Sequence, residues 1–386
     1  MRFPRTEFDR RLGNVRRQME RRGIDLLLVY SSPGSMRYGQ RGHVLYLSGY
    51  EPYFGDTMML FPLENDIEPL LQIDQADFFP EECTWIRNIV PAQDPVATLR
   101  KYMKDNKLGQ IRIGIVGEYS MNPRLVQRLS DSSAWKIEFV SEILESERSV
   151  KSRYEIDCIK TAANIAHVAF EVAREIACPG ITEAEMVALV ESACRLMGSE
   201  GFPHHTMVTS GVFEKHLDWW WYCGRRTLRR GDPWNMDLGT MFGGYCCDIS
   251  RSFCLGKPAE EHVKAYSILI SAMEEAREEM RPGVKASKVN DVVIDVMSKR
   301  FKGDFSGIGH GVGLEVHEWP FVGYQYIKND PVYADSRLRE NNVISIEPQV
   351  YLPEFGYLQI EDEFIVTRSG GKRISDIPLE LMTPNR

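Results

Sequence analysis

Two acidic residues flank a glycine turn in the segment 235–253, which reads Asn-Met-Asp-Leu-Gly-Thr-Met-Phe-Gly-Gly-Tyr-Cys-Cys-Asp-Ile-Ser-Arg-Ser-Phe. Aromatic and β-branched residues on both sides of Phe242-Gly243-Gly244 predict two short antiparallel strands joined by a tight turn. A turn centred between Phe242 and Gly243 places Asp237 directly opposite Asp248, with Cβ atoms about 5 Å apart. Two carboxylates that close repel each other unless a proton or a cation lies between them. The segment therefore predicts a site for a hard divalent cation.

A second predicted hairpin near the C-terminus repeats this arrangement. Residues 343–348 and 356–361 have the pattern of strands, and Glu347 and Glu361 are equidistant from residue 354 in the turn between them. A glycine-dense stretch between the two hairpins, Gly-Ile-Gly-His-Gly-Val-Gly-Leu-Glu-Val-His-Glu-Trp-Pro, delivers His310 and His317. Each piece alone has a structural explanation, as an edge charge or a hydrogen-bonded histidine. Together, two facing carboxylate pairs and an imidazole predict a site for two adjacent divalent ions.

These residues resemble those of the pita-bread metallopeptidases of family M24, which include prolidase, aminopeptidase P, methionine aminopeptidase, creatinase and ectoine hydrolase. The resemblance lies in the strings Met-Asp-Leu-Gly, Cys-Asp-Ile-Ser-Arg-Ser-Phe, Gly-His-Gly-Val-Gly, Ile-Glu-Pro and Ile-Glu-Asp-Glu, and it covers nearly the whole chain. It implies an α+β protein of the prolidase and creatinase branch, with a pita-bread catalytic domain after an α/β N-terminal domain. It also implies that Asp237 binds one ion, that Asp248 and Glu361 bridge both ions, and that His310 and Glu347 bind the second ion.

The chemistry expected of such a site is hydrolysis of a C–N bond. Carboxylates with a single imidazole suit Mn²⁺, Co²⁺, Fe²⁺ or Zn²⁺, and ligand type does not choose among them. Water shared by two cations is acidified toward hydroxide, which attacks a carbonyl while Glu347 shuttles the proton. The resemblance implies that His317 contacts the substrate or its tetrahedral intermediate. His216 follows Ser210-Gly211 at a shorter spacing than the histidine of family peptidases, so it is either catalytic or an ordinary loop residue.

Two departures from the prolidase pattern leave the substrate open. Prolidases that resemble this chain often carry an arginine for the substrate carboxylate after the Glu-Trp-Pro string, whereas Phe321 follows here. Trp219-Trp220-Trp221-Tyr222 either packs a long loop or forms an aromatic wall for a cationic or cyclic small molecule. The leading prediction is an Xaa-Pro peptidase. The alternatives are a creatine- or ectoine-type hydrolase, a dimethylsulfoniopropionate lyase, or a binding module without catalysis.

The chain order predicts two domains, residues 1–148 and 149–386. Strands expected at 25–30, 58–61, 69–73 and 111–116, with a helix at 95–106, indicate an N-terminal α/β domain with a mixed or parallel sheet. Beyond the boundary, an amphipathic helix from Ile156 ends at Pro179-Gly180, and the capping box Thr182-Glu183-Ala184-Glu185 begins another. Helices expected at 259–280 and 287–299 precede the second hairpin. The order helix, helix, hairpin thus occurs twice, which indicates an internal pseudo-repeat with the site at its junction.

The amino-acid composition and charge of the chain limit the classes of binding partner that can be expected. A net charge of −8 and a pI near 5.6 argue against a nucleic-acid partner. The basic cluster at residues 225–230 is interpreted as a solvated loop, with a nucleic-acid patch or a substrate-carboxylate site as alternatives. Eight cysteines without Cys-x-x-Cys spacing, a charged N-terminus and the lack of a bilayer-spanning run predict a cytoplasmic protein with reduced thiols and no membrane partner. A homodimer is expected from the family resemblance, and the substrate is a short peptide or small molecule.

Overall fold

The computed structural model describes residues 3–33, 41–74, 76, 82–212, 223–302, 304–323, 336–353 and 356–384. The chain divides into two compact units, Met1–Arg148 and Ser149–Arg386. None of the helices within the described ranges combines the length and the apolar character that crossing a membrane requires.

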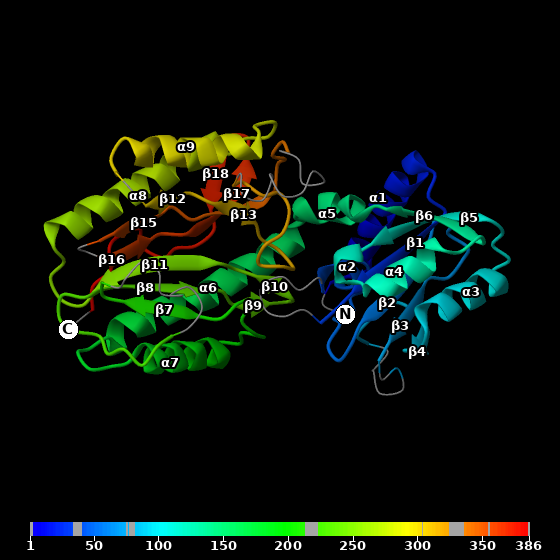
Figure 1. Ribbon diagram of the computed structural model, residues 1–386, viewed down its shortest axis with the longest axis horizontal. Helices are drawn as coiled ribbons and strands as arrows, with labels where there is room; N and C mark the ends of the chain where they lie inside the picture. Colours follow the sequence, from blue (N-terminus) through cyan, green and yellow to red (C-terminus); the bar gives the residue numbers. More distant parts are fainter. Residues whose placement is uncertain are drawn as a thin grey trace. The chain divides into compact units, whose positions relative to one another are not determined.

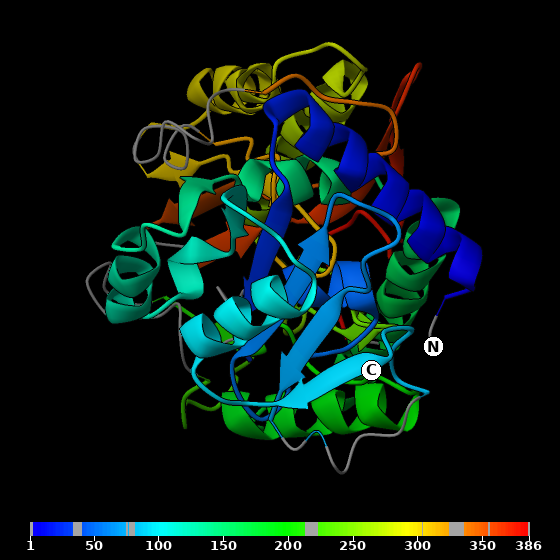
Figure 2. The same cartoon turned by 90° about the vertical axis from the view of Figure 1, so that its right-hand side faces the viewer.

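The N-terminal unit is built on a mixed six-stranded sheet of order β4-β3-β2-β1-β5-β6, which Figure 2 shows facing the viewer. The central strand β1 pairs antiparallel with β2 and parallel with β5, and all of its residues are buried because both faces are covered. The strands are β1 (Leu26–Ser31), β2 (Thr57–Pro62), β3 (Leu70–Ile73), β4 (Asn88–Pro91), β5 (Ile111–Val116) and β6 (Trp135–Phe139). The helices are α1 (Arg5–Arg22), α2 (Gly42–Ser48), α3 (Pro95–Asp105), η1 (Glu118–Ser120), α4 (Pro123–Ser130) and α5 (Ser141–Ser149).

The C-terminal unit places strands between two helix pairs. Figure 1 shows α8 and α9 on one side of the strands and α6 and α7 on the other. The helices are α6 (Arg153–Ile176), α7 (Glu183–Leu196), α8 (Glu260–Glu279) and α9 (Ala286–Ser298). The strands are β7 (Met207–Ser210), β8 (Pro233–Leu238), β9 (Met241–Phe242), β10 (Tyr245–Cys246), β11 (Ile249–Cys254), β12 (Phe305–Ser306), β13 (Gly309–Gly311), β14 (Val343–Ile346), β15 (Gln349–Leu352), β16 (Gly356–Gln359), β17 (Asp362–Thr367) and β18 (Gly370–Arg373).

The predicted order of helix, helix and hairpin is observed twice in this unit. The first half begins with α6 and α7, each started by a capping box, Ser152 with Glu155 and Thr182 with Glu185. Its strands run in the order β11-β8-β7, and the strands of the second half contain the corresponding order β17-β14-β13. Each half therefore places a helix pair against a three-stranded antiparallel arrangement whose central strand leads to the first carboxylate of its hairpin.

The register of the first hairpin differs from the prediction by two residues. Gly243 and Gly244 both have positive φ, 60° and 80°, so they form the two central positions of the turn, and Phe242 pairs with Tyr245. With the turn centred there, Asp237 pairs with Ser250, and Asp248 lies two residues before Ser250, on the turn side of this pair. The predicted direct pairing of Asp237 with Asp248 is therefore wrong. Their positions are diagonal on the same face, which still brings the two carboxylates together.

The register of the second hairpin agrees with the prediction. Strand β15 pairs with β16 through Gln349 opposite Gln359, and β14 pairs with β17 through Ile346 opposite Asp362. Both pairings are symmetric about residue 354, so Glu347 and Glu361, which lie between them, are opposite each other. The second carboxylate pair is therefore set by a hairpin whose centre the sequence located correctly.

Candidate metal centre

The predicted acidic and histidine ligands converge in the C-terminal unit, and all of them are buried. His310 Nε2 lies 3.7 Å from Asp248 Oδ2, 3.6 Å from Glu347 Oε1 and 3.7 Å from Glu361 Oε1. These three carboxylates come from both hairpins, while His310 comes from β13 at the edge of the second sheet. Oxygen and imidazole donors at these separations suit a divalent cation placed between them.

His310 has the hydrogen-bonding pattern of a metal ligand. Its Nδ1 lies 3.2 Å from the carbonyl oxygen of Gly311, a contact that places the ring proton on Nδ1 and leaves the Nε2 lone pair facing the carboxylates. Within the described residues Nε2 has no hydrogen-bond partner, although the side chain is completely buried. A buried acceptor surrounded by carboxylates fits a cation, which would bind both kinds of donor at once.

A second group contains a histidine that the sequence analysis did not assign to the site. His204, in the segment before β7, places Nε2 2.9 Å from Asp248 Oδ1 and 3.7 Å from Asp237 Oδ1. The ligand atoms of His204, Asp237 and Asp248 all lie within 4.8 Å of one another, as do those of His310, Glu347 and Glu361. Two cation-sized groups of donors thus lie side by side, since the Asp248 carboxylate contacts both histidines.

Neighbouring polar groups orient the carboxylates of the second hairpin. Ser345 Oγ donates to Glu361 Oε1 at 2.7 Å, and Gln359 Nε2 donates to Glu347 Oε2 at 3.2 Å. Glu347 Oε1 is the oxygen nearest His310, so Gln359 holds the other oxygen away from it. Such outer contacts fix the rotamers that a metal site requires before the ion binds.

The charges of the site favour a cation. Burial raises the pKa of Glu361, and the neighbouring Asp248 carboxylate raises it further. Burial also opposes the charge on Asp248, but the surrounding histidines, His204 first, hold its pKa below its usual range. Burial lowers the pKa of His204, and the carboxylates of Asp248 and Asp237 outweigh it, raising the pKa to about 9. Positive charge is therefore stabilised here, and divalent ions supply it.

A buried arginine holds the strand segments that carry two of the carboxylates. Arg251, fully buried on β11, donates to the carbonyl oxygens of Ser250 at 2.9 Å and Glu361 at 2.6 Å, and to Asp362 Oδ2 at 2.6 Å. Its remaining contacts are with the carbonyls of Pro378 and Ile377, at 3.0 Å and 3.2 Å. One guanidinium thus ties the first hairpin to the backbone of Glu361 and to the C-terminal segment.

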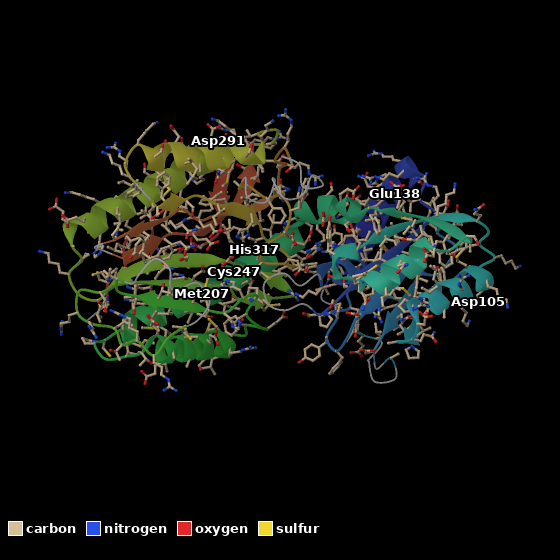
Figure 3. All side chains as sticks on the ribbon, in the orientation of Figure 1. Asp105, Glu138, Met207, Cys247, Asp291 and His317 are labelled. Carbon is tan, nitrogen blue, oxygen red and sulfur yellow. The ribbon has the colours of Figure 1, made fainter. Side chains whose placement is uncertain are left out.

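His317, labelled in Figure 3, lies in the loop after β13 and faces the same site. Its Nε2 is 4.0 Å from Asp248 Oδ2, and its ring meets that of His310 edge-on, with centroids 4.1 Å apart. A buried ion pair anchors the loop, because Lys151 Nζ donates to Glu318 Oε1 at 2.7 Å. The backbone of Glu318 also pairs with Gly311, which fixes His317 relative to β13.

Two predicted groups cannot be placed. His216 and the aromatic run Trp219 to Tyr222 lie outside the described residues. The basic cluster that follows them is described: its exposed members are Arg225, Arg229 and Arg230, while Arg226 is half-buried and bonds to Ser210 and Asp232.

Comparison with protein families gives two matches. Residues 157–368 match "Metallopeptidase family M24", and residues 11–150 match the "Creatinase/Prolidase N-terminal domain". The first range contains the acidic and histidine residues of both candidate groups, and the second covers most of the N-terminal unit.

Known proteins similar to this chain include an Xaa-Pro dipeptidase of Pyrococcus horikoshii, 30% identical over 94% of this chain and 96% of its own length. The crystal structure of X-Pro aminopeptidase from Thermotoga maritima is 26% identical, with a TM-score of 0.83 over 96% of this chain and 99% of its own. The prolidase structure from Pyrococcus horikoshii is 27% identical, with a TM-score of 0.78 over 96% of this chain and 99% of its own. These likenesses extend over both units and are to pita-bread proteins, which confirms the predicted fold class.

Proposed function

The chain belongs to metallopeptidase family M24, and from this premise we propose that it hydrolyses the peptide bond before a proline residue. It is a metal-dependent hydrolase of peptide C–N bonds with a dinuclear divalent centre, as the leading prediction stated. The alternatives among small zwitterions, a creatine- or ectoine-type hydrolase or a dimethylsulfoniopropionate lyase, are not favoured by its relatives. The observation that carries the proposal is the convergence of His310 with three carboxylates from two hairpins.

We assign the metal ligands by their place in the two donor groups. Asp237 would hold the first ion, and His310 with Glu347 would hold the second. Asp248 and Glu361 would be shared by both ions, and for Asp248 this assignment is supported by its contacts with His204 on one side and His310 on the other. Manganese is proposed as the first ion to test, since Mn²⁺, like Co²⁺, Fe²⁺ and Zn²⁺, suits carboxylates with few imidazoles and ligand type does not choose among them.

Two divalent ions held by these residues would supply an acidified water and polarise the scissile carbonyl. Glu347 is the general base, since its Oε2 is held by Gln359 while Oε1 points to the centre of the site. His317 contacts the substrate carbonyl region, because its ring lies against His310 and within 4.0 Å of Asp248. The buried Lys151–Glu318 pair fixes the loop that carries it.

Substrate length is the next question, because the similar proteins include both a dipeptidase and an aminopeptidase. Phe321 occupies the position after the Glu-Trp-Pro string, and its aromatic ring offers no positive charge to a free proline carboxylate. We therefore propose that peptides longer than two residues are preferred. His216 is proposed as a further substrate contact, and residues 219–222 as substrate-binding residues, with packing of a long loop as the alternative for 219–222.

Further features are proposed from the family resemblance. We expect the chain to act as a homodimer in the cytoplasm on short peptides. We also propose that catalysis resides in residues 149–386, which hold both donor groups, while residues 1–148 form a separate creatinase-like domain.

The test is proline-directed cleavage by protein loaded with Mn²⁺ or Co²⁺, using Xaa-Pro dipeptides and matched Xaa-Pro peptides of three to five residues. We expect the bond before proline to be cut and the longer peptides to be preferred. Asp248→Asn removes the shared carboxylate, so turnover should fall by more than about 100-fold. Asp295→Asn, an exposed position on α9, is the matched control. Full turnover of Asp248→Asn, or no cleavage by the metal-loaded protein, would contradict the proposal.

A further inference from the structure

We propose that His204 is a protein ligand of the first metal ion, completing with Asp237 and Asp248 a site that contains its own imidazole. The inference rests on the dinuclear assignment proposed above and adds a ligand to it. Each ion would then bind one histidine, His204 on one side of Asp248 and His310 on the other.

The distances fit a shared cation. Bonds of about 2.0–2.2 Å from an ion to nitrogen and oxygen place neighbouring ligand atoms roughly 3 to 3.5 Å apart. His204 Nε2 is 2.9 Å from Asp248 Oδ1 and 3.7 Å from Asp237 Oδ1. The corresponding distances from His310 Nε2 to its carboxylates are 3.6 and 3.7 Å. Both histidines therefore lie within reach of a cation shared with their carboxylates, and the shorter 2.9 Å contact of His204 is also a hydrogen bond to Asp248 Oδ1.

The Nδ1 contacts of the two imidazoles correspond, whereas their Nε2 atoms differ: His204 Nε2 is hydrogen-bonded to Asp248 Oδ1, a contact that a bound ion would replace, and His310 Nε2 has no hydrogen-bond partner within the described residues. His204 Nδ1 lies 2.9 Å from the carbonyl oxygen of His205, and His310 Nδ1 lies 3.2 Å from that of Gly311. In both cases the next residue's carbonyl accepts the Nδ1 proton, so Nε2 is left to face the carboxylates. Metal-binding histidines characteristically donate their other ring N–H to a carbonyl or carboxylate.

Gly239 gives His204 room to approach. A Cβ at position 239 would lie 3.0 Å from His204 Nε2 and 2.5 Å from the Cys247 carbonyl oxygen. A side chain at 239 would therefore clash with the Cys247 carbonyl oxygen and with Pro203 Cγ at 2.6 Å, and would crowd the imidazole beside Asp248. The glycine next to the first carboxylate strand is thus part of what lets the histidine enter the site.

The pseudo-repeat supports the same assignment. His310 lies on β13, the strand that pairs with β14 in the second half. His204 lies three residues before the start of β7, which occupies the corresponding place beside β8 in the first half. Each half therefore contributes, in chain order, a helix pair, one buried histidine and two carboxylates.

The experiment measures metal binding directly and needs no peptide substrate, so it is independent of the proposed peptidase activity. Metal-free full-length protein is titrated with Co²⁺, following stoichiometry by calorimetry and ligand type by visible absorption. His204→Gln is compared with wild type and with His205→Gln, the matched control at the exposed neighbouring position. Glutamine retains an N–H that can donate to Asp248 but lacks the imidazole, so the variant separates ligation from hydrogen bonding.

We expect two ions per chain in wild type and in His205→Gln. In His204→Gln one of the two affinities should fall by at least about 100-fold, with a changed Co²⁺ absorption spectrum. Unchanged affinity and spectrum in His204→Gln would overturn the proposal, as would a wild type that binds a single ion. A second measurement does not require the His204→Gln variant to fold. When one Mn²⁺ is bound to the His310→Gln variant, pulsed electron paramagnetic resonance should still show coupling of the ion to an imidazole nitrogen. Absence of that coupling would also overturn the assignment.

Discussion

Replacing Arg251 by lysine should destabilise the C-terminal unit while preserving the charge. The guanidinium donates to five oxygen acceptors, of which four are backbone carbonyls and one is Asp362 Oδ2. A lysine ammonium has three N–H donors at a single point, so at least two of the five hydrogen bonds are lost. The carbonyls of Ser250 and Glu361 keep their backbone bonds to each other, so the loss falls mainly on Pro378, Ile377 and Asp362. At about 2 kcal/mol for each buried hydrogen bond to a charged group, the loss is roughly 4 kcal/mol.

The assay is thermal and urea unfolding of metal-free Arg251→Lys and wild type, since bound metal would add stability of its own. A unit of this size changes its melting temperature by about 2–4 °C per kcal/mol, so a fall of roughly 8–16 °C is expected. Arg229→Lys, at an exposed position, is the control and should change stability by less than about 0.5 kcal/mol.

The same substitution should weaken metal binding, because Arg251 bonds to the backbone of Glu361. The affinity for Co²⁺ should fall by about 10- to 100-fold, as for other groups that orient a ligand. A destabilisation below about 1 kcal/mol would refute the reasoning, since it would mean that the buried carbonyls find other partners. Strong destabilisation with unchanged metal affinity would refute the claim that Arg251 positions Glu361.

Three further predictions follow from other parts of the molecule. The buried Glu7 carboxylate accepts from Arg10 and Arg11; burial opposes its charge, but these arginines lower its pKa below 4.5. The charged Glu7 therefore stabilises the folded state above pH 4.5, and this stabilisation is lost as the pH falls through the lowered pKa. Glu7→Gln should reduce the free energy of unfolding by about 1–3 kcal/mol at pH 7 and by progressively less below pH 4.5. Equal reductions at pH 7 and pH 3, measured by urea unfolding, would contradict this. Phe321→Arg should raise kcat/KM for Xaa-Pro dipeptides by about 5- to 30-fold relative to longer peptides, because it supplies a charge for the free carboxylate; an unchanged ratio would show that this position does not contact the substrate end. Chelation should lower the melting temperature by roughly 5–10 °C, since an ion at 100 times its Kd adds about 2.7 kcal/mol, and Asp248→Asn should show a much smaller change; an equal shift in both proteins would place the stabilising ion elsewhere.

The second hairpin shows how far sequence pattern alone reaches. Its strands are apolar, its turn lies in one short segment, and the observed pairings of both strand pairs are symmetric about residue 354. Register is strongly determined where a face is buried, because a slip of one residue would turn every side chain to the other face. The opposition of Glu347 and Glu361 was therefore predictable without a template.

The first hairpin marks the limit of that reasoning. Phe242-Gly243-Gly244 is compatible with two turn centres one residue apart, and these differ by two residues in the pairing that they impose. Both centres keep Asp237 and Asp248 on the same face, so the burial pattern does not distinguish them. The distinction lies in the backbone, where positive φ at both Gly243 and Gly244 selects a two-residue turn. Two adjacent glycines were the available signal for that turn.

The missed histidine and the wrong register have one physical origin. In the predicted register Asp237 stands opposite Asp248, and the first carboxylate pair leaves no place for a third donor between its strands. In the observed register Gly239 takes the position opposite Asp248, and the space that its missing side chain leaves is where His204 Nε2 approaches. His204 comes from a segment more than 30 residues earlier, and its local sequence, Pro-His-His, carries no ligand spacing. A two-residue shift in one turn thus changes the donors that can be expected around a metal ion, and we expect a side chain at position 239 to weaken metal binding by crowding His204.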